Sequence, residues 1–515
     1  MEPLNLSVPR QHDFTDPRVE RNIKRLRGWL TGLPLMDVVE TIRLVLNALD
    51  ALNEQKMDVQ SRFDSLEAFH VTVQGLFVTL DPVHLRQLSL SIERREQAIE
   101  GVERLLLSLA AGYKLVVITL HKGQASGKLD KLFGLAVNRS IETLVYTLLD
   151  CFRFYRATQP CYYLELHQLY RLARHHGLMH IKPDDAGEDH SAATASTADL
   201  YHTGMLAALM DPFRLAEGEI SVLFEVLSQH AEHCRIIPGR CQPGDGKGRY
   251  QIDLGSDRMP VSCIDLEPSA VVEEPYILDI TKVLESAREQ LQQVPDKVRM
   301  LSPEAMLLRQ LSPEDQKLKQ RAEKRHAITR RAQLLRGIGS IHDFLVRPSL
   351  KEVLGQAARG KSPSMVKPYQ CQVLDSSENG MRLSWVNNDD SDVRVGDLLA
   401  VVQGEPGEEY LQLAILRSVH VFRQGAMDAG VMLIKGGVGA VYCYFPGESP
   451  SRGSSALFVT TADDEQGAAT LVAAKGIYEE GRRLSIDIAD KHINVRAGRL
   501  IFNGPVFDRF EFSAE

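Results

Sequence analysis

Residues 369–385 read YQCQVLDSSENGMRLSW, and this stretch decides how the C-terminal part of the chain is interpreted. The pattern of residues 369–374 predicts a strand, and residues 381–385 predict the strand that returns. Between them, residues 375–380 supply Asp, Ser, Asn and Gly, which bond their own backbone and tolerate positive φ. The stretch therefore predicts a β-hairpin with a tight polar turn.

The polar turn also carries a motif. Asp375, Ser377 and Gly380 stand in it as D-x-S-x-x-G, which resembles the second half of the signature of PilZ domains. PilZ domains are small bacterial β-barrels that bind the second messenger cyclic di-GMP. The resemblance implies that Asp375 and Ser377 accept the N–H donors of a guanine edge, and that Gly380 keeps side-chain bulk away from the ligand.

The first half of the PilZ signature is an R-x-x-x-R segment. Arg321 and Arg325 have this spacing in the most basic stretch of the chain, and Arg330 and Arg331 follow as second candidates. The resemblance implies that these arginines clamp phosphates and stack on guanine, because a guanidinium offers forked donors and a flat face. The arginines lie farther from the turn than the family usually has them. The sequence between, residues 337–365, is expected to be partly helical.

Sequence downstream of the hairpin supports a barrel. A V-G-D segment at 395–397 precedes an apolar run at 398–402, and residues 411–422 and 430–433 read as further strands. The resemblance covers residues 321–435, whereas strand-like patterns continue to the C-terminus. Many short strands need closure or a second sheet to protect their edges. The expectation is an elaborated PilZ-like barrel or a barrel with a second β-unit appended.

The N-terminal half has a different periodicity. Apolar residues recur at three- and four-residue spacing between about 17 and 234, which predicts antiparallel helices in a bundle or short solenoid. Asp81-Pro82 has the form of a helix start. Residues 234–263 read as a small β excursion, and residues 279–293 and 303–335 as helix again, the basic stretch included.

The predicted fold class is therefore multidomain α+β, with an all-α N-terminal half followed by a C-terminal PilZ-like antiparallel β-barrel. We divide the chain into a helical domain at 1–235 and a small β excursion with a helical connector at 236–320. The basic segment, the barrel and a C-terminal extension follow at 321–515.

Composition excludes some partners. A formal net charge of −8 over 515 residues argues against bulk binding of a nucleic acid polymer. No apolar run approaches the about 18 residues of a membrane span, and the first residues lack the pattern of a signal peptide, so a cytoplasmic protein is expected. The seven cysteines are scattered without C-x-x-C pairs, which predicts reduced thiols.

Other patterns carry less weight. Residues 123–129 lack the spacing of a P-loop and are expected to join two helices. His175, His176 and His180 have no carboxylate or cysteine partner at ligand spacing, so no metal is expected. No catalytic constellation is present. The chain is therefore not expected to be an enzyme or to hold a cofactor.

The leading hypothesis is a cytosolic signalling receptor. The barrel would bind cyclic di-GMP, a basic segment would fold over the ligand, and the helical half would contact a protein partner. Similarity to large PilZ proteins suggests motility, pili or surface attachment. The alternative hypothesis is a degenerate PilZ-like scaffold that acts only through protein–protein contacts, and the distance between the arginines and the turn favours it.

Overall fold

The computed structural model describes most of the chain: residues 4–123, 128–183, 195–242, 248–264, 266, 271–299, 302–311, 326–346, 368–386, 393–404, 409–422, 426–448, 453–460, 469–488 and 491–515. The chain forms two units. One comprises Met1–Pro212 and Glu217–Gln320, and the other comprises Phe213–Ala216 and Arg321–Glu515.

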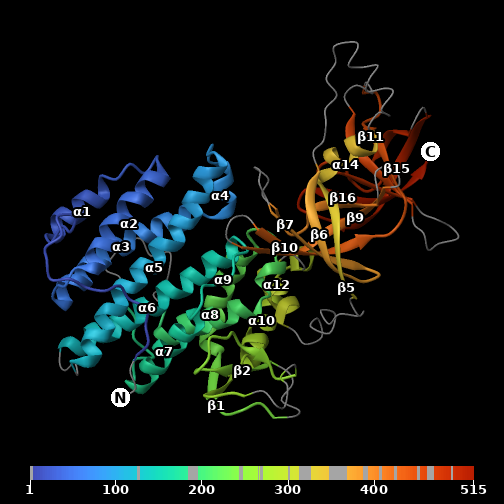
Figure 1. Cartoon of the computed structure of the whole chain (residues 1–515). Coiled ribbons are helices and arrows are strands. Elements are labelled where there is room, and N and C mark those ends of the chain that lie inside the picture. Colours follow the sequence, from blue (N-terminus) through green and yellow to red (C-terminus); the bar gives the residue numbers. More distant parts are fainter. Residues whose placement is uncertain are drawn as a thin grey trace. The chain divides into compact units, whose positions relative to one another are not determined.

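The first unit is an array of packed helices, in which both consecutive pairs such as α5 and α6 and more distant pairs such as α2 and α5 are in contact (Figure 1). Its longest helix, α5, packs on α2, α3 and α6, and buries Leu105, Leu109 and Tyr113. Asp81 caps α4 with Pro82 at the first turn, as the sequence predicts. The helices of the array are α1 Ile23–Thr31, α2 Val38–Glu54, α3 Val59–Thr79, α4 Pro82–Gln87, α5 Ile92–Lys122, α6 Lys128–Arg153, α7 Tyr162–His175, α8 Thr197–Leu209 and α9 Glu219–His230.

Helix α5 is also, within the described part of the chain, the one helix that is long and apolar enough to cross a membrane by length and composition. Most of its apolar window, 61%, is buried inside the unit. That burial is the pattern of a core helix, which satisfies the same test of length and hydropathy.

A four-stranded sheet completes the first unit, in the order β1-β4-β2-β3. Among the described residues, helices α10, α11 and α12 follow it. The elements are β1 Arg235–Pro238, β2 Arg249–Asp253, β3 Val261–Ser262, β4 Pro275–Asp279, α10 Thr281–Gln293, α11 Asp296–Arg299 and α12 Pro303–Leu311. Asp257, between β2 and β3, connects the sheet to the helical array. Its carboxylate accepts hydrogen bonds from the backbone N–H groups of Cys161, Tyr163 and Leu164 at the start of α7.

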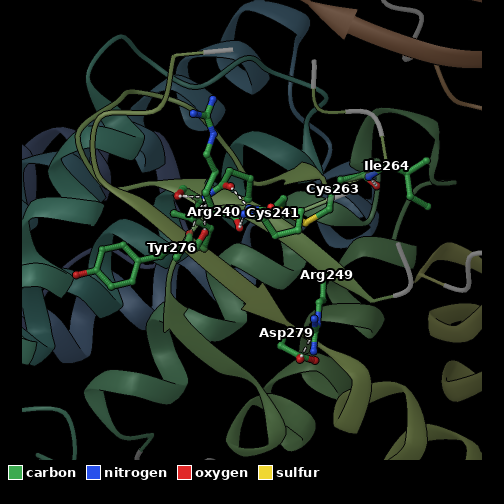
Figure 2. The surroundings of a disulfide bond; sticks show 12 residues. Arg240, Cys241, Arg249, Cys263, Ile264, Tyr276 and Asp279 are labelled. Atoms are coloured by element: carbon green, nitrogen blue, oxygen red, sulfur yellow. Dashed lines mark hydrogen bonds and ion pairs between the residues drawn. A yellow bond between two sulfur atoms is a disulfide. The ribbon is translucent and has the colours of Figure 1, made fainter. Parts of the chain in front are cut away.

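This small sheet corrects the expectation that all cysteines are reduced. Cys241 and Cys263 form a disulfide with Cα atoms 5.6 Å apart, and Figure 2 shows the bond beside the Arg249–Asp279 ion pair. The backbone N–H of Cys263 donates to the carbonyl of Arg249, and that of Cys241 to Oε1 of Gln251. Strand pairing therefore brings the two cysteines together, which their sequence spacing does not reveal.

The second unit contains two closed antiparallel barrels of six strands each, with strand orders β10-β7-β6-β5-β8-β9 and β11-β12-β13-β16-β15-β14. The first barrel uses β5 His326–Arg336, β6 Tyr369–Ser376, β7 Gly380–Val386, β8 Leu398–Gln403, β9 Tyr410–Val421 and β10 Ala426–Ile434. The second uses β11 Val438–Tyr444, β12 Ser454–Val459, β13 Thr470–Ala474, β14 Arg483–Ile488, β15 Lys491–Asn503 and β16 Phe507–Ala514. The predicted fold class is thus confirmed, with the second β-unit appended as its own barrel.

Helix α14, Gly337–Leu345, joins the cores of the two barrels. Its residues Ile341 and Phe344 share one apolar cluster with Leu413 of the first barrel and with Val459 and Val472 of the second. The helix lies between β5 and β6 in the sequence, so a partly helical insertion is confirmed there.

The basic stretch departs from its prediction. Residues 326–336 form strand β5, not a helix, and β5 pairs with β6 on one side and β8 on the other. Ala332, Leu334 and Leu335 are buried, whereas the basic first half is exposed. Two neighbouring strands outweigh the helical periodicity of the local sequence, because ladder pairing and burial override propensity.

Candidate functional site

The β6–β7 hairpin predicted from the sequence is confirmed, with its turn at residues 377–379. Ser377 closes the turn: its backbone N–H donates to the carbonyl of Gly380 at 2.8 Å, and its hydroxyl donates to the same oxygen at 3.3 Å. Gly380 is buried as the first residue of β7 and is not among the described glycines with positive φ. The tight turn therefore forms without a positive φ at this glycine.

The turn is also held from the side by strand β10 and the residues after it. The carbonyl of Asn379 accepts a hydrogen bond from the N–H of Leu433 at 3.0 Å, and Lys435 pairs with Glu378. The hydrogen bond and positive charge of Lys435 lower the pKa of Glu378 below its usual value. These contacts fix the position of the turn at one end of the barrel.

Two β-bulges accompany this end of the barrel. One lies between Ala327 and Arg330 on β5, and the other between Val373 and Asp375 on β6. Bulges change the direction of side chains and are frequent at barrel rims and beside functional sites.

The bulge on β6 turns Asp375 to the outer face of the barrel. Val373 is buried and pairs with Leu383, which is fully buried. Without the bulge, Asp375 would follow Val373 to the inner face, because side chains alternate along a strand. Instead the residue opposite Asp375 in the β-ladder is Arg382. The Arg382 side chain is exposed and forms an ion pair with Asp428.

Strand β5 meets β6 at the same place. His326 pairs with Ser376, and Ala327 pairs with Asp375. The chain therefore enters the first barrel opposite the D-x-S-x-x-G turn. Arg321 and Arg325 precede His326 in the sequence and lie outside the described residues.

Arg330 and Arg331 are both exposed on β5 but lie on different faces. Arg330 pairs with the buried Val373, so it shares the inner face with Ala332. Arg331 pairs with Gln372, which is exposed, and so it shares the outer face with Asp375. From the sequence, Arg330 and Arg331 are equivalent candidates. The strand register places them on different faces of the barrel.

Sequence reasoning missed one charged pair in this barrel. Nη2 of Arg336, the last residue of β5, lies 3.3 Å from Oδ2 of Asp397, which also accepts the backbone N–H of Arg394 at 3.0 Å. Asp397 is buried, at 7% exposure. From the sequence, the V-G-D segment that contains Asp397 predicts only the start of a strand. An acidic residue directly before the apolar run at 398–402 is the sequence signal that could have indicated a charged partner.

Among the described residues, no group of three or more His, Cys, Asp or Glu side chains could hold a metal ion. His175 and His176 make an edge-on ring contact, and His176 makes another with His121. Burial, together with the charges of His175 and His121, lowers the pKa of His176. Their arrangement is that of packed surface rings.

A helical array followed by two antiparallel barrels, with a PilZ-like turn at the rim of the first, defines a multidomain α+β protein. Two models of known protein families match parts of this chain. The N-terminal domain of the cyclic-di-GMP receptor FimW matches residues 24–239, and the FimW C-terminal β-barrel domain matches residues 446–514. Both matched models describe domains of a cyclic-di-GMP receptor, which agrees with the resemblance drawn from the hairpin.

A curated relative agrees with the family matches. The chain is similar to the cyclic-di-GMP receptor FimW of Pseudomonas aeruginosa, with 23% identity over 99% of this chain and 94% of the relative. The two family matches fall on the helical array and the second barrel. The first barrel, with the D-x-S-x-x-G turn, lies between them.

Proposed function

We propose that this chain is a cyclic di-GMP receptor and that the outer rim of its first barrel binds the nucleotide. The observation that carries the proposal is the register of β5 and β6, in which Ala327 pairs with Asp375 and His326 with Ser376. Arg325 is the residue before His326 in the sequence, and we therefore propose that both halves of the PilZ-like motif meet at this place on the barrel. The name of the curated relative, a cyclic-di-GMP receptor, supports the same ligand.

The residues suit the ligand chemically. A guanine edge presents N–H donors, and the Asp375 carboxylate and the Ser377 hydroxyl can accept them. Arg321 and Arg325 would pair with the phosphates and stack on a guanine face, and Arg331 would add a third guanidinium on the same face. Gly380 would contribute by leaving the edge of the hairpin free of a side chain.

The register also bears on the alternative of a degenerate scaffold. The feature that favours a degenerate scaffold is the long sequence between the arginines and the D-x-S-x-x-G turn. Helix α14 and the residues that follow it occupy that interval between β5 and β6, which are themselves neighbours in the barrel. A long insertion is therefore compatible with a complete site.

The ligand would also act on the arrangement of the chain. The segment that carries Arg321 and Arg325 joins the helical unit to the first barrel in the sequence. We propose that phosphate binding draws this segment against the barrel, which changes the interdomain contacts available to a protein partner of the helical half. Small-angle scattering with and without cyclic di-GMP tests this step, and superimposable curves for a saturated protein would contradict it.

Calorimetric titration with cyclic di-GMP tests the ligand and the site together. We expect Arg325→Ala and Asp375→Ala each to weaken binding by about tenfold or more, because each removes a charge-assisted contact. Arg499→Ala is the matched control, since Arg499 is exposed in the second barrel and pairs with Glu511. Unchanged affinity in both site variants would overturn the proposed site. A folded wild-type protein that gives no binding heat would favour the scaffold.

The cellular role follows from the same proposal. A non-enzymatic receptor in the cytoplasm that acts in motility, pili or surface attachment is the role that similarity to large PilZ proteins suggests. Complementing a deletion strain with wild-type and Asp375→Ala genes, and then measuring surface motility and attachment, tests it. Equal rescue by both genes would separate the role from nucleotide binding.

A further inference from the structure

Helix α1 carries an unusual concentration of positive charge for an acidic protein. Lys24, Arg25 and Arg27 are all exposed on this helix of nine residues, and none of them forms an ion pair with another described residue. The chain as a whole has a formal net charge of −8. This face is therefore positive on a molecule that is otherwise repelled by anionic surfaces.

Two exposed apolar side chains follow this helix, in the turn between α1 and α2. Leu35 is 61% exposed and Met36 is fully exposed. The turn holds them there: the carbonyl of Pro34 accepts the N–H of Asp37 and the hydroxyl of Thr41, both at 2.8 Å. Single exposed apolar residues are ordinary, but an adjacent pair on a braced turn is a defined feature.

A tryptophan and a pocket lie on the same helix. Trp29 is 38% exposed, and its ring meets Phe69 of α3 edge-on with centroids 6.4 Å apart. Trp29, Phe69 and Leu26 line a pocket of about 210 Å³, and Arg25 and Glu20 line it as well. The pocket thus combines an apolar wall with the guanidinium groups of Arg18 and Arg25 and with the carboxylate of Glu20.

We propose that α1 and the turn after it dock on an anionic lipid surface. Cations flanking exposed Trp, Leu and Met are the composition of an interfacial membrane contact. A protein partner would need a preformed cavity for a side chain as prominent as Met36, whereas lipid conforms to it. Helix α1 packs on α3 and lies at the edge of the helical array (Figure 1).

The test is sedimentation of the full chain with phosphatidylcholine vesicles that contain phosphatidylglycerol, alongside vesicles without it. We expect binding to the anionic vesicles only, weakened by salt. The pair Lys24→Glu and Arg27→Glu should lower the partition coefficient by about tenfold or more, as each cation near an anionic surface contributes about fivefold. Leu35→Glu with Met36→Glu should also lower it, through loss of apolar contact.

Fluorescence gives a second readout that does not depend on sedimentation. The chain has two tryptophans, and Trp385 is buried at 4% exposure, so a blue shift on vesicle binding reports Trp29. Val271→Glu is the matched control, because Val271 is 82% exposed outside this face. All these positions are exposed, so the variants should fold. No binding to anionic vesicles, or binding that both charge and apolar variants retain, would overturn the proposal.

Discussion

Gly436 lies so close to Thr460 that a Cβ on the glycine would be 1.5 Å from the Thr460 carbonyl oxygen. Gly436 also has a φ of +123°, which L side chains rarely adopt. It stands between the last strand of the first barrel and the first strand of the second. Only glycine allows the link to pass so near β12, and the shared core of the two barrels depends on that path.

Gly436→Ala should therefore destabilise the barrel unit by more than about 2 kcal/mol, through backbone strain and the clash with Thr460. Gly439→Ala is the matched control, since a Cβ there meets nothing within 4 Å. Urea unfolding followed by circular dichroism measures both. Equal midpoints for the two variants would show that the close approach is not a constraint.

Asp150 on α6 predicts a pH dependence of stability. Burial, with a smaller contribution from the charge of Glu103, raises the pKa of Asp150 to about 7 against the opposing charges of Arg153 and Arg156. The folded protein therefore retains a proton that the unfolded chain releases above the ordinary pKa of 3.8. The free energy of unfolding should fall as the pH rises from about 4 to 7 and be level above that, as far as this group is concerned.

Asp150→Asn should remove this dependence. We expect it to stabilise the protein at pH 8 by on the order of a few kcal/mol and to change little at pH 4. Asp13→Asn serves as the control, because Asp13 is an exposed carboxylate paired with Lys56. Urea unfolding at the two pH values measures the effect. A stability difference independent of pH would mean that Asp150 is ionised in the folded protein.

The disulfide in the small sheet predicts a dependence on reductant. Cys241 and Cys263 are separated by 22 residues in the sequence. A crosslink that closes a loop of that size lowers the entropy of the unfolded chain and so stabilises the folded state by about 3 kcal/mol. Dithiothreitol should lower the unfolding midpoint of the first unit, and Cys263→Ser should lower it equally without reductant. Cys161→Ser, at an exposed free thiol, should have no effect. A wild-type midpoint insensitive to reductant would contradict the stabilising role.

The two faces of β5 give a prediction for the ligand site. Arg331 shares the outer face with Asp375, whereas Arg330 shares the inner face with Val373. If the nucleotide binds the outer rim, Arg331→Ala should weaken cyclic di-GMP binding by several-fold, or about 1 kcal/mol, and Arg330→Ala should change it less. Calorimetry on the two variants decides. The opposite order would move the ligand to the mouth of the barrel.

Local chemistry explains which features the sequence predicted. The hairpin at 369–385 was predictable because Asp, Ser, Asn and Gly determine a turn through their own side chains and backbone, as the Ser377 bonds illustrate. The helices were predictable from the periodicity of apolar residues. The start of α4 was predictable from Asp81 followed by Pro82, which is the pattern of a helix cap. These features depend on neighbours in the sequence.

Features that depend on distant residues were not predictable. Strand β5 has a helical pattern, but β6 and β8 pair with it from both sides. The outward direction of Asp375 depends on a bulge, and the Cys241–Cys263 bond depends on how β2 and β3 pair. The sequence also indicated which residue types suit the ligand, but Arg330 and Arg331 became distinct only through their partners on β6.

Photocrosslinking with 8-azido cyclic di-GMP, followed by peptide mass spectrometry, tests the central claim most directly. The claim is that both halves of the PilZ-like motif meet at one site on the first barrel. We predict crosslinked peptides from the segment around Arg321–Arg331 and from the hairpin around Asp375, all lost in the presence of unlabelled nucleotide. Competed crosslinks confined to the helical unit or to the second barrel would contradict the claim.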